Sequence, residues 1–494
     1  MRFTLGVDIG TYETKGVLVD EAGSIVAQSA RAHDMIVPQA GWAEHRADED
    51  WWGDFVYVTQ ALLEQSGVDP GDIACVATSA IGPCLLAVDG EGKPLMNGIL
   101  YGVDTRASAQ IAQLNEQIGE DVVFERCGNA LTSQSIGPKI LWLKEQRPEI
   151  FAQAKWLMGS TSFLVMKLTN EVVIDHYTAA NFSPFYDVQT QDWSDELAPD
   201  VLDLARLPRL MWSNEIAGKI TDKAAQETGL AVGTPVTCGT IDAAAEAISV
   251  GVTQTGDTMM MYGSTIFMIM LTESRLSDAR LWYAPWVFEG QHAAMAGLAT
   301  SGTLTHWFRD QFARELSRAE AFGALAQEAA ASPTGANGLL MLPYFSGERT
   351  PLHDPLAKGA FFGLNLTHTR GDMYRALLEG IAFGTRHVVD CFAEAGQKPK
   401  NLLAVGGGLR NEVWMKATSD ICGLTQIMRE KTVGASFGNA FLAACAVGLA
   451  KPDEITDWNP LGQKMHANTQ DVYEETFRHF VALYRQTQDI AHAL

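Results

Sequence analysis

The stretch TLGVDIGTYETKG (residues 4–16) joins a short apolar run to a turn of small and polar residues. Apolar and small residues alternate through residues 3–9, which predicts a strand that carries Asp8 near its end. The Gly10-Thr11 turn that follows can aim backbone N–H groups and a hydroxyl at phosphate oxygens, and Asp8 is placed to hold a hydrated Mg²⁺. Taken alone, the same pattern also fits an ordinary strand and turn.

A similar element recurs near the middle of the chain. The run PVTCG (235–239) predicts a strand, and Thr240 and Asp242 follow it before a helix of small residues, AAAEAISVG. Asp242 is a carboxylate of the kind that accepts a proton from an attacking hydroxyl. It fits equally well as an N-terminal cap of that helix, and the sequence leaves both roles open.

A predicted strand pair follows each of these elements. The run DTMMMYGSTIFMIML (257–271) predicts two strands about the turn Gly263-Ser264, and the first element leads into its own strand meander. Together with Thr265, this turn is a candidate second phosphate-binding hairpin, although as an isolated hairpin it would be unremarkable. We therefore expect a duplicated α/β unit with its boundary near residue 233, which divides the chain into residues 1–232 and 233–494.

The length of the chain supports more than one domain. At 494 residues it exceeds the roughly 250–300 residues at which a single hydrophobic core stops growing. Hydrophobic residues make up 47% and charged residues 19%, which predicts packed globular domains. Further strands are expected at 73–81 and 97–104, and the helix-rich segment from about 130 to 215 suits an insertion that builds one wall of a cleft.

Charge and composition exclude several classes of partner and site. The formal net charge of -23 repels nucleic acid and anionic membranes, so neither is expected as a partner. The start of the chain lacks a secretory pattern and its longest near-apolar window is too short to span a bilayer, so we expect a cytoplasmic protein. The seven cysteines are scattered and the eleven histidines form no H-E-x-x-H pattern, which favours structural or surface roles for them over disulfides or zinc.

A run of three glycines, Gly406 to Gly408, lies between a predicted strand and a predicted helix. Such a run permits a flat or anionic ligand to approach where a Cβ atom would block it. The G-x-G-x-x-G spacing of a dinucleotide-binding loop is not met, because Asn411 stands where the last glycine belongs. The chain also has no G-x-x-x-x-G-K-[ST] loop, so this turn indicates a nucleotide site of another kind.

The order of these motifs is more specific than any one of them. The segments GVDIGTYETKG, CGTIDAAAEAISVG, YGSTIF, LPYFSGERTPLHDPLAKGAFFGL, ALLEGIAFG, AVGGGLRNEVWMKATSDICG and TVGASFGNAFLA together resemble the FGGY family of carbohydrate kinases, within the actin-like ATPase superfamily. The resemblance runs from residue 3 to about residue 450 and is closest to the xylulokinase branch, with GWAEHRADEDWW and WLKEQRPEIF in matching places. The stretch 343–366 is its most family-specific part.

The resemblance implies an α/β fold of two ribonuclease-H-like domains flanking a central cleft, with a sugar-binding domain at 1–232 and an ATP-binding domain at 233–494. By analogy Asp242 is the general base and Asp8 orients Mg²⁺-ATP. The residues that would line the phosphates are Gly10, Thr11, Gly263, Ser264 and Thr265, and those that would line the adenosine are Gly407, Gly408 and Asn411. Lys15 is a further candidate for the nucleotide, although a solvated lysine at that turn would look the same.

The sequence departs from the xylulokinase pattern where sugar contacts are expected. In AIGPCLL (80–86), Gly82 and Pro83 stand where that branch has Met-His. In YGVDTR (101–106), Asp104 and Arg106 survive while the aromatic and amide residues differ. These four residues and Asp242 are the candidate sugar-binding residues, and for Asp104 and Arg106 a structural ion pair is the alternative.

The function that this resemblance implies is an ATP- and Mg²⁺-dependent sugar kinase that phosphorylates a terminal hydroxyl of D-xylulose. Alternatives within the class are kinases for gluconate, glycerol, ribulose or another polyol, ketose or sugar acid. Outside the class, an actin-like ATPase that controls a protein partner and a catalytically idle sugar-binding regulator remain as alternatives. Because dimers are frequent among similar kinases, a homodimer is the expected assembly.

Overall fold

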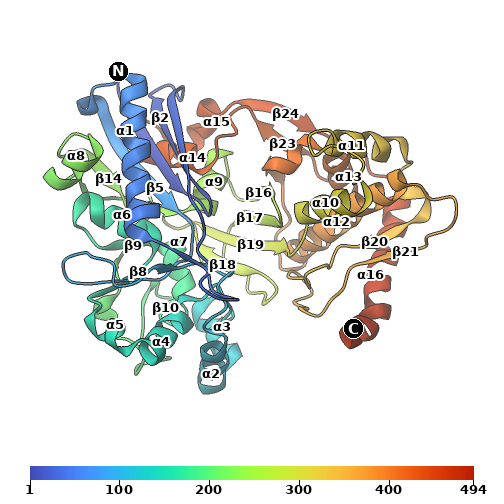
Figure 1. Cartoon of the computed structure of the whole chain (residues 1–494), viewed down its shortest axis with the longest axis horizontal. Coiled ribbons are helices and arrows are strands. Elements are labelled where there is room, and N and C mark those ends of the chain that lie inside the picture. The colour runs from blue at the N-terminus through green and yellow to red at the C-terminus, as the bar shows by residue number, and fades with distance from the viewer.

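Two mixed β-sheets organise the chain, and the computed structural model describes all residues from 1 to 494 (Figure 1). The first sheet has the order β13-β14-β5-β1-β2-β3, with β15 also paired to β5. Its strands are β1 (Phe3–Ile9), β2 (Glu13–Asp20), β3 (Ile25–Ala32), β5 (Ile73–Ala80), β13 (Ile216–Lys219), β14 (Pro235–Thr237) and β15 (Thr240–Ile241). Its principal helices are α1 (Asp54–Ser66), α6 (Ser160–Thr169), α8 (Asp222–Thr228) and α9 (Asp242–Ser249).

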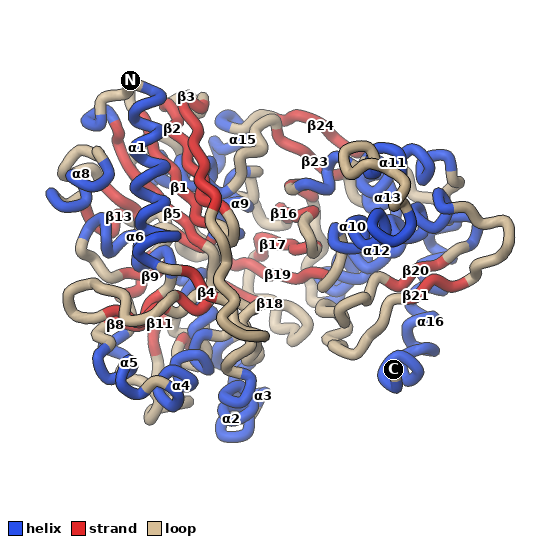
Figure 2. Tube along the Cα trace, in the orientation of Figure 1, coloured by secondary structure: helices blue, strands red, loops and turns tan.

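The second sheet has the order β18-β19-β17-β16-β22-β23-β24 (Figure 2). Its strands are β16 (Asp257–Tyr262), β17 (Ile266–Thr272), β18 (Trp282–Pro285), β19 (His292–Leu298), β22 (Asn401–Val405), β23 (Gln426–Arg429) and β24 (Leu461–Met465). The helices of this half are α10 (Gly302–Phe312), α11 (Ala321–Ala331), α12 (Arg370–Glu394), α13 (Glu412–Cys422), α14 (Ala435–Ala446), α15 (Ile455–Trp458) and α16 (Asp471–Ala493). A short hairpin, β20 (Leu340–Leu342) with β21 (Ala360–Phe362), packs against α12.

The two sheets repeat one pattern of strand pairing, which confirms the expected duplication. In the first, β1 pairs antiparallel with β2 and parallel with β5, and in the second β16 pairs antiparallel with β17 and parallel with β22. The division at residue 232 stays a prediction. Strands β14 and β15 follow that residue in the chain, yet they pair with β5 of the first sheet. This pairing indicates that the chain crosses between the sheets after α9.

Helix α14 comes from the second half of the chain but lies on the first sheet, against β1 and β5 (Figure 1). Glycines make this approach possible. A Cβ atom on Gly6 of β1 would lie 2.0 Å from the Ser436 carbonyl oxygen, and one on Gly438 would lie 1.9 Å from the Ala245 carbonyl oxygen of α9. Sheet, α14 and α9 therefore pack backbone to backbone.

We expect Gly438→Ala to separate α9 from α14, because its methyl group would collide with backbone atoms that cannot rotate away. The loss in unfolding free energy should reach the upper part of the range of about 1–3 kcal/mol that overpacking produces, and chemical unfolding will measure it. The matched control is Gly323→Ala in α11, where a Cβ atom meets nothing within 4 Å. That change should raise the unfolding free energy by about 0.5–1 kcal/mol. Equal changes in unfolding free energy at the two sites would contradict the prediction.

The helical segment begins earlier than the sequence indicated. Helices α2 (Ser108–Ile118) and α3 (Glu120–Cys127) precede α4 (Ile136–Gln146), α5 (Pro148–Gln153) and α7 (His176–Ala179). The short strands among them and before them are β4 (Glu44–His45), β6 (Leu86–Val88), β7 (Gly98–Ile99), β8 (Trp156–Met158), β9 (Val173–Asp175), β10 (Tyr186–Asp187), β11 (Asp192–Trp193) and β12 (Arg209–Met211). The strand expected at 97–104 was wrong beyond β7, because the chain turns there with Asp104 N–H donating to the Tyr101 carbonyl (3.0 Å).

A bilayer-spanning helix is not found, since none combines sufficient length with sufficient apolar character.

Candidate active site

Three neighbouring strands of the first sheet end at the same edge. Ile9 of β1 and Ile241 of β15 both lie opposite Ala80 of β5, and all three strands run parallel. Because the carboxyl ends of parallel strands meet at one edge, the residues that follow them converge there. The Gly10-Thr11 turn, Gly82-Pro83 and Asp242 are thereby brought together, and a Cβ atom on Gly82 would lie only 3.0 Å from the Ile241 side chain.

The second sheet brings its two glycine turns together in the same way. Met261 of β16 lies opposite Val405 of β22, so the Gly263 hairpin and the Gly406 turn leave one edge. A Cβ atom on Gly406 would lie 2.6 Å from the Tyr262 carbonyl oxygen, and its φ of +100° favours glycine. The start of α10 also holds the hairpin, because Gly302 and the preceding Ser301 donate backbone N–H groups to the Gly263 and Ser264 carbonyls (3.1 and 3.0 Å).

Asp8 is oriented by a chain of hydrogen bonds that begins on α14. Asn439 Nδ2 donates to Ser79 Oγ (2.7 Å) and to the Val7 carbonyl (2.9 Å), and Ser79 Oγ donates to Asp8 Oδ1 (2.6 Å). Burial raises the pKa of Asp8 to about 6, while the Ser79 hydrogen bond and the Lys15 charge oppose that shift. The carboxylate is therefore held in one direction and responds to nearby cations.

Asp242 and Glu246 lie one turn apart on α9, so their carboxylates share one face of the helix. Burial raises the pKa of Asp242 well above its usual range, and the charges of Asp8 and Glu246 add to the effect. Burial and the Asp8 charge likewise raise the pKa of Glu246 to about 7. Asp242 also accepts a hydrogen bond from the Ala243 N–H (2.7 Å), but the arrangement goes beyond a helix cap because three carboxylates repel one another here.

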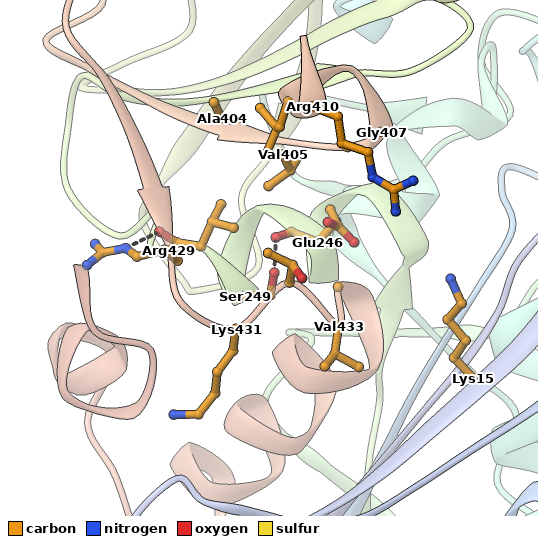
Figure 3. A pocket seen from close by; sticks show the side chains of 15 residues that line it. Lys15, Glu246, Ser249, Ala404, Val405, Gly407, Arg410, Arg429, Lys431 and Val433 are labelled. Carbon is orange, nitrogen blue, oxygen red and sulfur yellow. Dashed lines mark hydrogen bonds between the residues drawn. The ribbon is translucent and has the colours of Figure 1, made fainter. Parts of the chain in front are cut away.

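A cavity of about 530 Å³, which we call the basic pocket, lies beside Glu246 (Figure 3). Four cationic side chains belong to its wall: Lys15, Arg410, Arg429 and Lys431. In Figure 3 the Lys15 ammonium and the Arg410 guanidinium point toward one another from opposite sides of the opening. In a chain of net charge -23, this concentration of positive charge favours a polyanionic ligand.

The residues expected at the adenosine lie next to the basic pocket. Gly406 and Gly407 line it, and a Cβ atom on Gly407 would meet nothing within 4 Å. Gly408 packs instead against Trp414 and Tyr262. Asn411 caps α13 by accepting from the Trp414 N–H (3.2 Å), so the structure gives its side chain a local role at the same turn.

Asp104 and Arg106 form a completed ion-pair network away from any free surface. Arg106 Nη2 donates to Asp104 Oδ2 (2.7 Å) and Glu44 Oε1 (2.9 Å), and the guanidinium lies 3.9 Å from the centre of the Trp42 ring. Asp104 also accepts from the Ala43 N–H (2.7 Å), and the two side chains are 0% and 2% exposed. The structure therefore favours the structural alternative over the expected sugar contact, because both oxygens of Asp104 and all but Nη1 of the Arg106 guanidinium nitrogens are already bonded within the protein.

Two family models cover most of the chain: the N-terminal domain of the FGGY family of carbohydrate kinases matches residues 3–249, and its C-terminal domain matches residues 258–447. The chain belongs to the FGGY family of carbohydrate kinases.

This FGGY kinase is 28% identical over 501 residues to a protein named xylulose kinase from Bacillus subtilis, covering 100% of this chain and 99% of that protein. It is 27% identical over 491 residues to a gluconokinase from the same organism, covering 97% and 91%. The crystal structure of xylulose kinase from Rhodospirillum rubrum superposes with a TM-score of 0.93 at 30% identity, covering 99% of this chain and 100% of that one. The chain is thus an enzyme, a phosphotransferase acting on a sugar hydroxyl with ATP, which favours the sugar kinase over the alternative of a protein-regulating ATPase.

Several side chains of this FGGY kinase site were missed from the sequence. Lys139 on α4 is fully buried and donates to the Leu100 and Tyr101 carbonyls (2.6 and 3.0 Å), and burial lowers its pKa to about 8. Tyr101 lies close enough to Asp242 for that charge to help raise its own pKa, after burial. A lysine inside the apolar run GPKILWL was the one available signal for Lys139, whereas nothing local distinguished Tyr101.

A second cavity of about 370 Å³, the polar pocket, begins next to Tyr101 in this FGGY kinase. Gly102, Gln134, Trp282, Arg349 and His353 are among its lining residues, so both halves of the chain contribute. The basic pocket borders Glu246 and the polar pocket borders the Tyr101 loop. Asp242 lies near both Glu246 and Tyr101, since the charge of Glu246 helps to raise the pKa of Asp242 and the charge of Asp242 helps to raise the pKa of Tyr101.

Proposed function

We propose that this FGGY kinase transfers the γ-phosphate of ATP to a terminal hydroxyl of D-xylulose, giving D-xylulose 5-phosphate. The observation that carries the proposal is the position of Asp242, a half-buried carboxylate of raised pKa at the meeting point of three strand ends. The basic pocket borders Glu246, one turn further along the same helix, and the polar pocket begins next to Tyr101, whose pKa the charge of Asp242 helps to raise. Full-length similarity to proteins named xylulose kinase supports the choice of sugar.

In this proposal the turns of both sheets hold the phosphates. The backbone N–H groups of Thr11, Ser264 and Thr265 face the triphosphate, and Lys15 adds positive charge. The N–H groups of Gly10 and Gly263 shape the turns instead, because they donate to the Glu13 and Thr265 carbonyls (2.9 and 3.1 Å). Asp8 suits Mg²⁺ as a single oxygen ligand, since no group of three or more acidic, histidine or cysteine side chains offers a complete metal site. Mg²⁺ held by Asp8 would neutralise the charge that develops on transfer.

Asp242 then accepts the proton of the attacking sugar hydroxyl. A base of raised pKa binds a proton more strongly than an ordinary aspartate, which favours transfer from a weakly acidic alcohol. The other residues of the site position ATP and the sugar, because phosphoryl transfer needs alignment and charge neutralisation rather than a covalent intermediate. Gly407, Gly408 and Asn411 are proposed to border the adenosine.

On the acceptor side, Gly82 and Pro83 supply a close wall rather than hydrogen-bonding side chains. Recognition of sugar hydroxyls then falls to Tyr101 and to the polar pocket, whose wall includes Thr132, Ser133 and Gln134. One observation favours a second candidate, gluconate, because Arg349 and His353 in the same pocket suit a carboxylate. Action in the cytoplasm and assembly as a homodimer stay predictions.

A panel of acceptors decides between these substrates. A coupled assay measures ADP release, and we expect D-xylulose to stimulate it. Its kcat/KM should be at least about 10-fold above those of gluconate, glycerol and ribulose, the ratio that roughly 1.4 kcal/mol of differential binding produces. Phosphorus NMR of the product identifies the phosphorylated hydroxyl. No stimulation by D-xylulose above the background ATPase rate would reject the proposed sugar, and stimulation by gluconate alone would establish the second candidate.

A further inference from the structure

Two histidines lie within hydrogen-bonding distance of the carbonyl groups of the Gly10-Thr11 turn. His33 Nε2 lies 3.0 Å from the Gly10 carbonyl oxygen, and His45 Nε2 lies 3.0 Å from the Thr11 carbonyl oxygen. The backbone N–H of His33 also donates to the Tyr12 carbonyl (3.0 Å). His33 follows β3, and His45 ends the short strand β4. Three consecutive carbonyls of the turn are therefore bonded to this one neighbouring segment.

The opposite face of the turn is left with free donors. In a planar trans peptide unit the carbonyl and the following N–H point in opposite directions. Because the Gly10 carbonyl points at His33, the Thr11 N–H points away from His33. Because the Thr11 carbonyl points at His45, the Tyr12 N–H points away from His45. Neither of these N–H groups donates to an acceptor within the protein. The Thr11 side chain lies beside Tyr101, which is itself near Asp242, so the free donors belong to the candidate active site.

The partners of His33 fix its protonation. Its Nε2 faces the Gly10 carbonyl and its Nδ1 lies 2.8 Å from Asp54 Oδ2, and both of these oxygens can only accept. Two acceptors require two ring protons, so His33 is an imidazolium. Burial lowers the pKa of His33, but the hydrogen bond and charge of Asp54 outweigh burial and raise it above its usual value.

The partners of His45 fix the opposite state. The Trp51 indole N–H, which can only donate, lies 3.1 Å from His45 Nδ1, so that nitrogen is an acceptor. The single proton is then on Nε2, directed at the Thr11 carbonyl. Burial and the charge of His33 lower the pKa of His45 to about 4, and the two rings meet edge to face with centres 4.9 Å apart.

The charged groups around the pair come from three elements. Asp54 begins α1, and its other oxygen lies 3.1 Å from Arg31 of β3. Asp50 acts from the π-helical turn Ala47–Gly53, where it pairs with Arg46 (2.6 Å). The Thr14 hydroxyl also donates to Asp54 (3.1 Å). Of the two histidines, His33 is the one whose pKa these surroundings raise.

We propose that His33 and His45 are positioning residues that orient the phosphate-binding turn, and that the charge of His33 is needed for tight nucleotide binding. The inference rests on the proposed function, since it takes the turn to contact the phosphates of ATP. The proposal also predicts the direction in which nucleotide affinity changes with pH. Raising the pH removes one of the two His33 protons, so either the Gly10 carbonyl or Asp54 loses its donor and nucleotide affinity falls.

The test measures ADP binding by calorimetry without any sugar, using the full-length protein from about pH 6 to pH 9. We expect the wild-type Kd to rise about 10-fold more over this range than that of His33→Gln, which should bind weakly throughout. His45→Gln should bind more weakly but keep the pH dependence. The matched control is His176→Gln, which replaces a half-buried histidine of α7 that contacts Tyr186 and Trp212. Its Kd should change with pH as that of the wild type does. Any part of the pH dependence that all variants share reports the ionisation of ADP itself.

Kinetics should agree, with KM for ATP raised in both variants and kcat changed less. Equal affinity and pH dependence in the wild type and His33→Gln would overturn the inference while leaving the kinase intact. A wild-type chain that binds no ADP would instead reject the proposed function, and the inference with it.

If thermal melting shows that His33→Gln does not fold, two other measurements decide. Asp54→Asn removes the negative charge that favours the second proton of His33, so it should flatten the pH dependence of binding. Nitrogen NMR of histidine-labelled wild-type protein should show both His33 ring nitrogens protonated at neutral pH. A neutral His33 there would overturn the inference.

Discussion

Replacing Asp242 by Asn is expected to lower kcat by about 10²–10⁴-fold, the usual contribution of a general base. The amide keeps the size of the side chain but cannot accept the proton of the attacking hydroxyl. Affinity for ATP should change little, because the proposed nucleotide contacts come from the turns and the basic pocket. The coupled ADP assay with saturating sugar measures the effect. Transfer at the wild-type rate would show that the base is assigned wrongly.

The same change should stabilise the fold at neutral pH. A carboxyl group whose pKa is raised on folding destabilises the native state as the pH rises from its unfolded pKa through its folded pKa, and the neutral amide removes that cost. Asp242→Asn should therefore raise Tm at neutral pH. The control is Asp222→Asn, which also alters the first residue of a helix but lies exposed on α8, and which should change neither kcat nor Tm appreciably.

The pH profile offers an independent check on this base. Activity should be lost as the pH falls through the pKa of Asp242, because the protonated acid accepts nothing. The charge of Glu246 contributes to the raised pKa of Asp242. Glu246→Gln should therefore move the acid limb of kcat/KM to lower pH.

Arg106→Met should lower the unfolding free energy by about 3–5 kcal/mol, since it leaves Asp104 and Glu44 without their cation in a buried site. Chemical unfolding measures the loss. The control is Arg209→Met, whose side chain is 59% exposed and lies 3.8 Å from Glu171, and which should have little effect. KM for the sugar in the folded fraction should stay near the wild-type value. A raised KM without lost stability would restore the direct sugar contact that the structure disfavours.

Local patterns explain why the two candidate carboxylates could be predicted to lie at strand ends. Asp8 and Asp242 each stand where a short apolar strand meets small residues, and strand-to-turn chemistry is set by neighbours in sequence. The glycine turns at residues 263 and 406 were found for the same reason. Asp104 and Arg106 were harder to interpret, because an acidic and a basic residue in a loop look alike whether they bind a sugar or each other.

Contacts between distant segments explain what was missed. Asn439 orients Asp8 through Ser79, and it lies 432 positions after Val7, to which it also donates. His33 and His45 carried no recognisable pattern, because their role depends on where β3 and β4 place them beneath the turn. Lys139 reaches the Tyr101 loop only because α4 packs beside it.

The sequence by itself determined the duplicated α/β organisation, the family resemblance and the strand-end positions of the two candidate carboxylates, because strand periodicity and turn composition act over a few residues. Only the tertiary structure decided which groups meet: the shared edge of β1, β5 and β15, the basic pocket formed by Lys15 and Arg410, and the burial that raises the pKa of Asp242. Proximity and desolvation arise from packing between segments far apart in the chain, and a linear pattern carries no record of them.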